Sequence, residues 1–489
     1  MKYLSKYEYL KFKCCPRLYA YNLCGYTLSE NGFNPLKDFL SAQGKEVGLL
    51  AQQLFTDKTT YTVHEKNIAL AVMETKEAFS KADIIFEGAF EYEGLVTRPD
   101  ILHINDKGLI EIKSTTEVKE EHLYDVAFQK YILNKCGLEI KTVKIGHINK
   151  QYVREGDLNL NGLFTFVDVT QIIALRISEI EQDLIPITNI IKNGHLPERE
   201  IGRHCNSDTG CPYKKECWRE SNNDTIFNLR RDVSGKKYDL HKGGILSLKD
   251  IPEYVSLTKF QALQKEAEIQ NCAIINQAAM VAALNEVAYP IYFLDFETFN
   301  NAVPELQNTT PFQQIPFQVS IHSLKAIKQK PKHFSFLHAD NSDPRKALAN
   351  FLLDSLGESG TIVAYHASFE IGRLYELIKV VPEKEAEILA LIDRVWDLEK
   401  IFDKGMYVHP EFLGSTSIKK VLPVMCPELS YDHLDINNGA LASIQYLKMI
   451  SPHTPKDEKN KIINDLEIYC CLDTFALYTI FKKLLQEIL

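Results

Sequence analysis

Two acidic residues stand in the middle of an otherwise apolar segment, YFLDFETF, at residues 292–299. The segment has the composition of a buried β-strand, and a strand places residues i and i+2 on the same face. Asp295 and Glu297 therefore point in the same direction and lie close together. Buried like charges repel each other and each is costly to desolvate, so a positive group is expected between them. A divalent metal ion is the simplest candidate.

Two later segments supply further acids. The sequence AYHASFEIGRL, residues 364–374, reads as a strand followed by a helix that begins near Glu370. The last helix contains YCCLDTFALYTI, in which Tyr469 and Asp473 are four positions apart and share one face. Carboxylates suit Mg²⁺ or Mn²⁺, and two such ions can hydrolyse a phosphodiester bond. The alternative for each acid alone is a solvated position, but the order of the four favours a metal site.

This series of motifs resembles the DEDDy branch of the DnaQ-like 3′–5′ exonucleases. The shared features are D-x-E on a first strand, an acid after Phe at a strand-to-helix junction, and Y-x-x-x-D on a late helix. The resemblance implies an RNase H-like mixed sheet and two metal ions. It implies that the metal ligands are Asp295, Glu297, Glu370 and Asp473, and that Tyr469 orients the attacking water. Glu370 departs from the family, which usually has Asp, and His366 stands near a position that is often Asn.

A second group of polar residues lies in TRPDILHINDKGLIEIKS, residues 97–114. Asp100 stands at the start of a predicted strand, and Glu111 and Lys113 share one face of the next strand. An Asp and a Glu can hold a metal ion while a Lys stabilises developing charge. Gln129 follows in the helix YDVAFQKYIL. A PD followed by E-x-K is short and common, so its meaning depends on its context.

The chain has eleven cysteines and no secretion signal, so a disulfide framework is not expected. Cys205, Cys211 and Cys217 lie in the polar stretch HCNSDTGCPYKKECW, where packing in a core does not explain them. Cys15 lies far upstream in CCPRLYAY, and Cys14 is the alternative to it. Buried apolar thiols and a four-cysteine zinc site are the competing interpretations. The C-x-x-C pairs usual in zinc sites are absent, which favours an iron–sulfur cluster.

An early cysteine, a PD-(D/E)xK core and a late C-x5-C-x5-C together resemble the iron–sulfur RecB/AddB-type nucleases, including the CRISPR-associated RecB-like group. The resemblance implies a 4Fe–4S cluster held by Cys15, Cys205, Cys211 and Cys217, which we expect to be structural. It implies a catalytic set of Asp100, Glu111 and Lys113, with Gln129 as a helper. Gly48 stands where the family has a metal-binding His, and Leu133 stands where a Tyr is expected. The metal site is then carboxylate-only, with Glu87 as a candidate helper, or this half only binds DNA.

The elements that position these residues form three predicted regions. Residues 1–220 read as an α/β domain of the PD-(D/E)xK nuclease type with the Fe–S cluster. Residues 221–285 read as a helical connector, and residues 286–489 as an α/β domain of the RNase H-like, DnaQ type. The fold class is therefore α/β. Joined in one chain, these halves look like a bacterial family known only as a domain of unknown function.

Composition limits the partners. The net charge of −9 argues against a broad basic surface, so contact with nucleic acid must be local. The segments KYLSKYEYLKFK and CPYKKECWR interleave basic and aromatic residues. They suit a single-stranded track, or else a solvated amphipathic surface. The N-terminus lacks an apolar signal region and no window is apolar enough to span a bilayer, so we expect a cytoplasmic protein without a membrane partner.

These observations predict a metal-dependent nuclease that acts on DNA with single-stranded ends. We expect 3′–5′ exonuclease activity from the C-terminal domain, and DNA binding or cleavage by the N-terminal domain. One alternative is a nucleic-acid-binding adaptor in which one or both centres are inactive. Another is an exoribonuclease, because no residue in the sequence can be assigned to recognition of the 2′-hydroxyl that distinguishes RNA from DNA.

Overall fold

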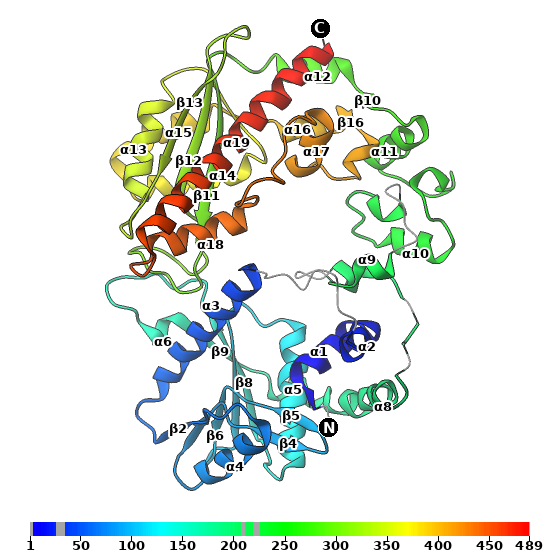
Figure 1. The fold of residues 1–489 in the computed structure, drawn as a ribbon, viewed down its shortest axis with the longest axis vertical. Helices are drawn as coiled ribbons and strands as arrows, with labels where there is room; N and C mark the ends of the chain where they lie inside the picture. Colours follow the sequence, from blue (N-terminus) through cyan, green and yellow to red (C-terminus); the bar gives the residue numbers. More distant parts are fainter. Residues whose placement is uncertain are drawn as a thin grey trace. The chain divides into compact units, whose positions relative to one another are not determined.

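A computed structural model describes residues 3–25, 35–194, 196–198, 200–206, 211–218 and 225–488 (Figure 1). The chain divides into two compact units. The first comprises Met1–Cys217 and Asn301–Gln313, and the second comprises Trp218–Asn300 and Gln314–Leu489. Both units combine helices with mixed sheets, so the predicted α/β class is confirmed. Among the described residues, no helix has both the length and the apolar character that crossing a membrane requires.

The first unit is built on a six-stranded mixed sheet of order β2-β3-β6-β7-β8-β9. Its strands are β2 (Thr60–Thr62), β3 (Ile84–Phe86), β6 (Ile101–His103), β7 (Gly108–Lys113), β8 (Thr142–Ile148) and β9 (Phe164–Asp168). A smaller sheet joins β1 (Leu4–Ser5), β5 (Leu95–Thr97) and β4 (Phe90–Tyr92). The helices are α1 (Lys6–Cys14), α2 (Pro16–Leu23), α3 (Pro35–Gln52), α4 (Ile68–Ala78), α5 (Glu120–Lys135), α6 (Leu160–Leu163), α7 (Thr170–Ala174), α8 (Ile177–Asn193) and α9 (Lys214–Cys217).

Both faces of β7 are covered, because its side chains alternate between two cores. Leu109 packs in a core with Phe128 of α5. Ile110 and Ile112 point to the other face and pack in a core with Val47 of α3. Glu111 and Lys113 share the face of Leu109, so the polar pair predicted from the sequence lies on the α5 side of the sheet.

The segment Asn301–Gln313 follows β11 in the chain but belongs to the first unit. Val303 and Phe312 pack with the second core of that unit. The Arg154 amide donates to the Thr309 carbonyl at 3.0 Å, and the Asn308 amide donates to the Arg154 carbonyl at 2.8 Å. This division differs from the predicted one, in which residues 221–285 formed a separate connector and residues 286–489 a single domain.

The second unit is built on a five-stranded sheet of order β13-β12-β11-β14-β15, in which β12 runs antiparallel to β11 and β13, and β11, β14 and β15 are parallel. Its strands are β11 (Ile291–Phe299), β12 (Ile315–Leu324), β13 (Lys332–Leu337), β14 (Thr361–Ala364) and β15 (Val395–Asp397), and β10 (Ile274–Ile275) pairs with β16 (Tyr407–Val408). The helices are α10 (Lys236–Lys242), α11 (Lys259–Gln270), α12 (Gln277–Leu284), α13 (Arg345–Ser355), α14 (Ser368–Ile378), α15 (Glu385–Ile392), α16 (Glu399–Asp403), α17 (Ile418–Met425), α18 (Gly439–Ile450) and α19 (Lys456–Ile488).

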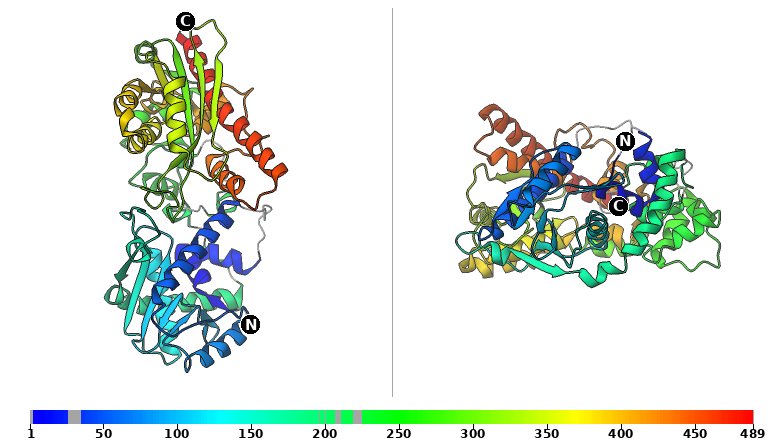
Figure 2. Two further views of the ribbon diagram at one scale, coloured as in Figure 1. Left: turned by 90° about the vertical axis from the view of Figure 1, so that its left-hand side faces the viewer. Right: turned by 90° about the horizontal axis from the view of Figure 1, so that it is seen from below.

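Helices cover both faces of this sheet (Figure 2). Leu294 and Phe296 of β11 pack in one core with residues of α13, α14 and α15. Phe293 points the other way and contacts Phe481 of α19, with ring centroids 5.7 Å apart. The odd-numbered side chains of β11 therefore face α19. Asp295 and Glu297 belong to this set.

Candidate functional site

Asp295 and Glu297 lie on the α19 face of β11, as their spacing predicts. Asp295 pairs with Ser320 of β12 and Glu297 pairs with Gln318, so the antiparallel neighbours carry no charge. The register shifts between Glu297 and Thr298, so regular pairing ends at the second acid. The irregularity sits beside the two carboxylates, a common position for such a feature near a functional site.

The side chains of Glu370 and Asp473 come from other elements and lie near Asp295 and Glu297. Glu370 lies in the first turn of α14, and Asp473 lies within α19. The charges of Asp473, Glu297 and Glu370 all act on Asp295. Glu370 and Glu297 are buried, while Asp295 and Asp473 border a cavity. The structure thus brings together the four acids that the sequence singled out.

Burial raises the pKa of each of these four carboxyl groups, and repulsion from neighbouring acids raises the pKa of Asp295, Glu297 and Glu370 further. The pKa of Glu370 is raised to about 8 and that of Asp473 to about 7. Glu370 Oε2 and Asp473 Oδ2 are buried without a hydrogen-bond partner among the described residues.

No ion pair within the described part of the chain involves any of these four acids. Lys419, at the exposed start of α17, is a nearby positive charge that lowers the pKa of Glu297 and Asp473 without pairing with either. A cluster of buried oxygen ligands that lacks a compensating cation fits hard divalent ions such as Mg²⁺ or Mn²⁺.

Two tyrosines lie beside Asp473. The Tyr431 hydroxyl donates to Asp473 Oδ1 at 2.7 Å, and the Tyr469 hydroxyl lies close enough to lower the pKa of the same carboxyl group. Burial raises the pKa of both phenols far above its usual value, so both stay protonated and act as donors. Tyr469 was predicted from its spacing on the helix. Tyr431 was missed because it lies in the segment between α17 and α18 and has no periodic relation to the acids.

Cys470 is a second neighbour that the sequence did not reveal. Single ligand atoms of Asp295, Glu297 and Cys470 all lie within 4.8 Å of one another. Burial, followed by repulsion from these acids, raises the pKa of the Cys470 thiol well above its ordinary value. The group is therefore a neutral thiol, which is a poor ligand for hard ions. Its side chain is fully buried.

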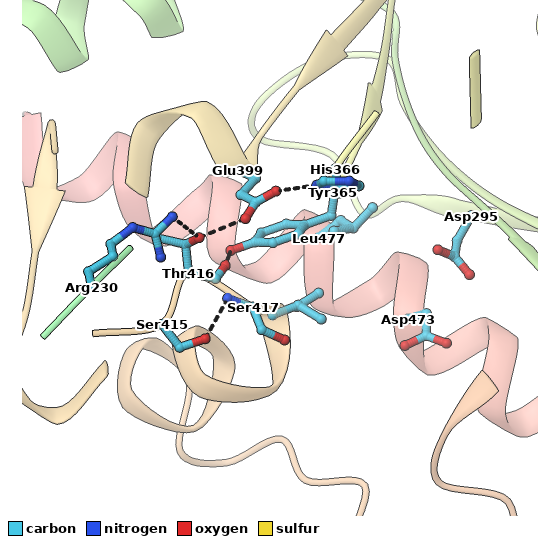
Figure 3. A pocket seen from close by; sticks show the side chains of 11 residues that line it. Arg230, Asp295, Tyr365, His366, Glu399, Ser415, Thr416, Ser417, Asp473 and Leu477 are labelled. Atoms are coloured by element: carbon cyan, nitrogen blue, oxygen red, sulfur yellow. Dashed lines mark hydrogen bonds and ion pairs between the residues drawn. The ribbon is translucent and has the colours of Figure 1, made fainter. Parts of the chain in front are cut away.

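A cavity of about 460 Å³ opens beside the acids (Figure 3). Asp295 and Asp473 border it, together with Leu477 of α19. Figure 3 shows a group of polar side chains at the opposite end of the view, away from the two acids. These are Arg230, Tyr365, His366, Glu399, Ser415, Thr416 and Ser417. The cavity therefore joins the acid cluster to a second polar surface within the same unit.

A chain of hydrogen bonds organises that second surface. The Arg230 guanidinium donates to Thr416 Oγ1 at 2.9 Å, and the Thr416 hydroxyl donates to Glu399 Oε1 at 2.7 Å. Glu399 Oε2 lies 2.8 Å from His366 Nδ1, which fixes the orientation of the imidazole. His366 has φ +61°, in the left-handed region, and its amide donates to Asp397 Oδ1 at 3.0 Å. Such backbone strain persists where the surrounding structure holds a side chain in place.

The residues predicted for the N-terminal centre also come together. Lys113 Nζ lies 2.9 Å from Glu111 Oε1, and Gln129 Nε2 donates to Glu111 Oε2 at 2.7 Å. Asp100 Oδ2 accepts a hydrogen bond from the Ile112 amide at 2.6 Å. Burial, and then the charge of Glu111, raises the pKa of Asp100 to about 7. Leu133 is fully buried in the core, which accounts for an apolar residue at that position.

Two further residues of this centre were missed. Lys6 Nζ lies 2.5 Å from Glu111 Oε1 and 3.7 Å from Asp125 Oδ1. Lys113 Nζ lies 2.5 Å from Asp125 Oδ2, so two ammonium groups form ion pairs with two carboxylates. Burial opposes ionisation of Glu111, but the charges of Lys113 and Lys6 hold its pKa far below its usual range. Lys6 is 105 positions from Glu111, so no local pattern connects them.

Glu87, the candidate helper, lies near this group. Burial raises its pKa, while the charges of Arg98 and Lys6 act in the opposite direction. Its backbone φ is +56°, and it follows directly after β3. The acids of the N-terminal centre therefore differ from those of the second unit in one respect: positive side chains already lie among them.

The four predicted cluster cysteines lie near one another. Burial raises the pKa of Cys211 to about 11, and the charges of Cys205, Cys15 and Cys217 also raise it. Cys14 lies in the same neighbourhood, since burial and the charges of Cys15 and Cys205 raise its pKa, and its Sγ lies 3.9 Å from the His204 carbonyl oxygen. Residues 207–210, between two of these cysteines, lie outside the described residues.

The N-terminal basic and aromatic segment is not a continuous exposed track. Tyr9 and Phe12 are buried in the core, and the Lys6 ammonium points into the acid group described above. Tyr3 and Tyr7 remain exposed, at 40% and 68%. The prediction of an interleaved surface is wrong for the buried residues, because α1 packs one side against α5. Lys2 and Arg219, the outer ends of the two predicted segments, lie outside the described residues.

Comparison with known proteins gives a family model and three uncharacterized relatives. Residues 292–417 match the model of a domain of unknown function, DUF2779. An uncharacterized protein of Ureaplasma parvum is 27% identical over 338 residues, which are 62% of this chain and 46% of that protein. An uncharacterized protein of Mycoplasma genitalium is 29% identical over 211 residues, which are 39% of this chain and 31% of that protein.

The matched part of the chain thus spans less than half the length of these relatives. No solved structure matches. The family match begins within β11 and includes Asp295, Glu297 and Glu370, but it ends before α19. The domain-of-unknown-function likeness expected from the sequence is therefore present.

Proposed function

We propose that the second unit is a metal-dependent nuclease that hydrolyses phosphodiester bonds in nucleic acid, preferentially DNA, from the 3′ end. One observation carries this proposal: four carboxylates from β11, α14 and α19 converge with no ion pair among the described residues, two of them buried and two bordering a cavity. Natural proteins rarely bury unpaired acids unless a metal or a reaction uses them.

The donor set and the resemblance to DEDDy exonucleases support the same function. Asp295, Glu297, Glu370 and Asp473 would hold the ions, and the strand order β13-β12-β11-β14-β15 suits an RNase H-like sheet. Bound Mg²⁺ or Mn²⁺ would make a water more acidic and stabilise the leaving oxygen. Glu370 has one more methylene than the usual Asp, and its placement in the first turn of α14 brings it to the other acids.

The surrounding residues have separate roles in this proposal. Tyr431 holds Asp473, and the Tyr469 hydroxyl would orient the attacking water. The cavity beside Asp295 would accept the terminal nucleotide, and His366 would donate a hydrogen bond to it. Lys419 would attract the phosphate backbone, since it is exposed and its charge already reaches Glu297.

The first unit is proposed to carry a 4Fe–4S cluster on Cys15, Cys205, Cys211 and Cys217. Cys15 is preferred over Cys14, because the charge of Cys15 acts on Cys211 and the Cys14 sulfur contacts a backbone carbonyl. The ligands come from the start and the end of the unit, so the cluster would fasten α2 to α9. A structural cluster of this kind stabilises a fold by the affinity of its metal.

A second candidate function, a nucleic-acid-binding adaptor, is favoured for the first unit by a specific observation. Lys6 and Lys113 already neutralise Glu111 and Asp125. The unit could then position DNA while the second unit cuts it.

The function is tested by a nuclease assay on end-labelled single- and double-stranded DNA and RNA with Mn²⁺ or Mg²⁺. We expect release of nucleotides from the 3′ end. Asp295→Ala should lower the rate of release by more than about 100-fold, which exceeds the effect of removing a residue that only supports a metal ligand. Asp457→Ala, an exposed acid near the start of α19, is the matched control and should leave the rate unchanged. If the wild type cleaves no substrate with either metal, or if Asp295→Ala cleaves normally, the proposal is wrong.

The cluster is tested separately. Protein purified without oxygen should be brown and contain iron and sulfide, and Cys211→Ala or Cys15→Ala should remove the colour. Cys136→Ala, an exposed cysteine after α5, and Cys14→Ala should both keep it. Colourless wild type with stoichiometric zinc would contradict the cluster.

A further inference from the structure

The acid group of the first unit already contains a cation that belongs to the chain. The Lys6 ammonium lies 2.5 Å from Glu111 Oε1, and the Lys113 ammonium lies 2.9 Å from the same oxygen. Both also approach Asp125, at 3.7 Å and 2.5 Å. Of the two predicted ligands, Asp100 and Glu111, the second therefore already contacts two nitrogen atoms, as does its neighbour Asp125.

The backbone around Lys6 is held firmly, so this is not a surface side chain in a chance position. Leu4 and Ser5 pair with β5 as strand β1, and the Ser5 amide donates to the Glu8 carboxylate at 3.1 Å at the start of α1. One turn later, Tyr9 stacks on Phe128 of α5 with ring centroids 4.7 Å apart. The Lys6 side chain itself is only 10% exposed. Its ammonium is therefore directed between β7 and α5.

The charges of the centre leave little room for a metal ion. Two ammonium groups pair with the carboxylates of Glu111 and Asp125, and Asp100, whose charge also acts on both lysines, is the third carboxylate. Gln129 donates to Glu111 and Asp125, at 2.7 Å and 2.8 Å, and uses one further lone pair on each. A divalent ion on Glu111 would have to displace at least one buried ammonium and leave it without a partner, which is strongly unfavourable. With Lys113 alone, three carboxylates would face one ammonium group, and Lys6 lowers that excess of negative charge from two to one.

We infer that Lys6 takes the place of a divalent ion in this centre, so that the first unit has the acid, amide and lysine set of a nuclease site but binds no Mg²⁺ or Mn²⁺ there. Asp100, Glu111, Lys113 and Gln129 then form a structural polar core rather than a catalytic one. This inference concerns metal binding alone, and it holds whether or not the second unit is a nuclease.

The test measures Mn²⁺ binding by electron paramagnetic resonance on the full chain. Asp295→Asn with Asp473→Asn removes the other acid site and gives the background protein. We expect this background to show no Mn²⁺ bound in the first unit. Adding Lys6→Met should create one Mn²⁺ site per chain, and a further Glu111→Gln should abolish it. Lys13→Met is the control, because Lys13 lies on the same helix but pairs with Asp183 at 3.0 Å.

Two results would overturn the inference. One is a Mn²⁺ site in the background protein that disappears with Glu111→Gln while Lys6 is intact. The other is a Lys6→Met protein with native circular dichroism that gains no Mn²⁺. If Lys6→Met fails to fold, a variant that keeps Lys6 can be tested instead. Glu111→Asp in the otherwise unchanged chain should not alter the number of Mn²⁺ ions bound. A loss of one ion would overturn the inference.

Discussion

Each unit places acidic side chains beside a strand, but among the described residues lysines pair with these acids only in the first unit. In the first unit, Glu111 and Asp125 are paired with two lysines and an amide. In the second, Asp295 and its three partners have no ion pair among the described residues, and burial raises the pKa of each. Both groups combine Asp and Glu side chains from a strand and a helix. What differs is the element that covers them: α1 brings a lysine, whereas α19 brings another acid.

Under the two proposals, this difference separates structural acids from functional ones. A paired acid contributes to the fold, and removing it leaves a buried cation unpaired. An unpaired buried acid costs stability and is retained where a ligand or a reaction needs it. The same substitution, acid to amide, should therefore have opposite effects on the stability of the two units.

The largest expected effect is on stability. Glu111→Gln should lower the free energy of unfolding of the first unit by about 3–5 kcal/mol, because Lys6 and Lys113 lose their shared partner. The measurement is calorimetry of the full chain. Glu121→Gln, an exposed acid of α5, should change it by less than about 0.5 kcal/mol.

Asp295→Asn should instead raise the stability of the metal-free second unit by about 0.5–2 kcal/mol, since it removes repulsion. Trp218 and Trp396 are the two tryptophans of the chain and both belong to the second unit, so their fluorescence follows its unfolding. If both substitutions destabilise their units equally, the comparison between paired and unpaired acids fails.

The pH dependence of stability should also differ. Glu370 and Asp473 have folded-state pKa values raised to about 8 and about 7, so the native state binds more protons than the unfolded chain above about pH 4. The stability they contribute is present below about pH 4 and is lost as pH rises through 7 and 8, by up to about 1.4 kcal/mol per pH unit for each proton. In the first unit the lowered pKa of Glu111 gives the opposite sign, with stability lost as pH falls below about 4, while the pKa of Asp100, raised to about 7, adds a loss of stability as pH rises through 7.

Denaturation of metal-free protein between about pH 5.5 and pH 8.5, followed by tryptophan fluorescence, checks the second unit. Mn²⁺ should restore its stability at the alkaline end, because the ion binds the ionised acids. Asp473→Asn should flatten the profile. A wild-type profile that rises with pH would show that the acids are compensated after all.

A smaller effect is expected from the tyrosine that the sequence did not reveal. Tyr431→Phe removes the 2.7 Å hydrogen bond to Asp473 and should lower the nuclease rate by about 10-fold, as other changes behind a metal ligand do. Tyr407→Phe, a buried tyrosine of β16 outside the acid group, is the control. Equal rates for Tyr431→Phe and wild type would remove Tyr431 from the site.

The smallest effect concerns the polar end of the cavity. His366→Ala should raise KM by about fivefold with little change in kcat, because one hydrogen bond to the substrate is worth about 1 kcal/mol. His433→Ala, on an exposed histidine of the same unit, should leave KM unchanged. A fall in kcat with an unchanged KM would assign His366 to the chemical step instead.

Much of the acid group in the second unit could be predicted from the sequence, because its arrangement depends on local periodicity. Period two placed Asp295 and Glu297 on one face of a strand, and the spacing of four placed Tyr469 and Asp473 on one face of a helix. Both spacings are present in β11 and α19. The sequence did not identify Tyr431 as part of the site, because it lies in an irregular segment. It did not identify Cys470 either, because a buried thiol has the same sequence pattern as any core residue.

The sequence by itself determined which residues can share a face: the acid pairs, the E-x-K pair and the spacing of the cysteines. Only the tertiary structure decided which charges meet across the chain. Lys6 reaches Glu111 because β1 and α1 pack beside β7 and α5, although 105 positions separate the two residues. Electrostatic compensation depends on distance in space, and local sequence patterns carry no information about contacts of that range.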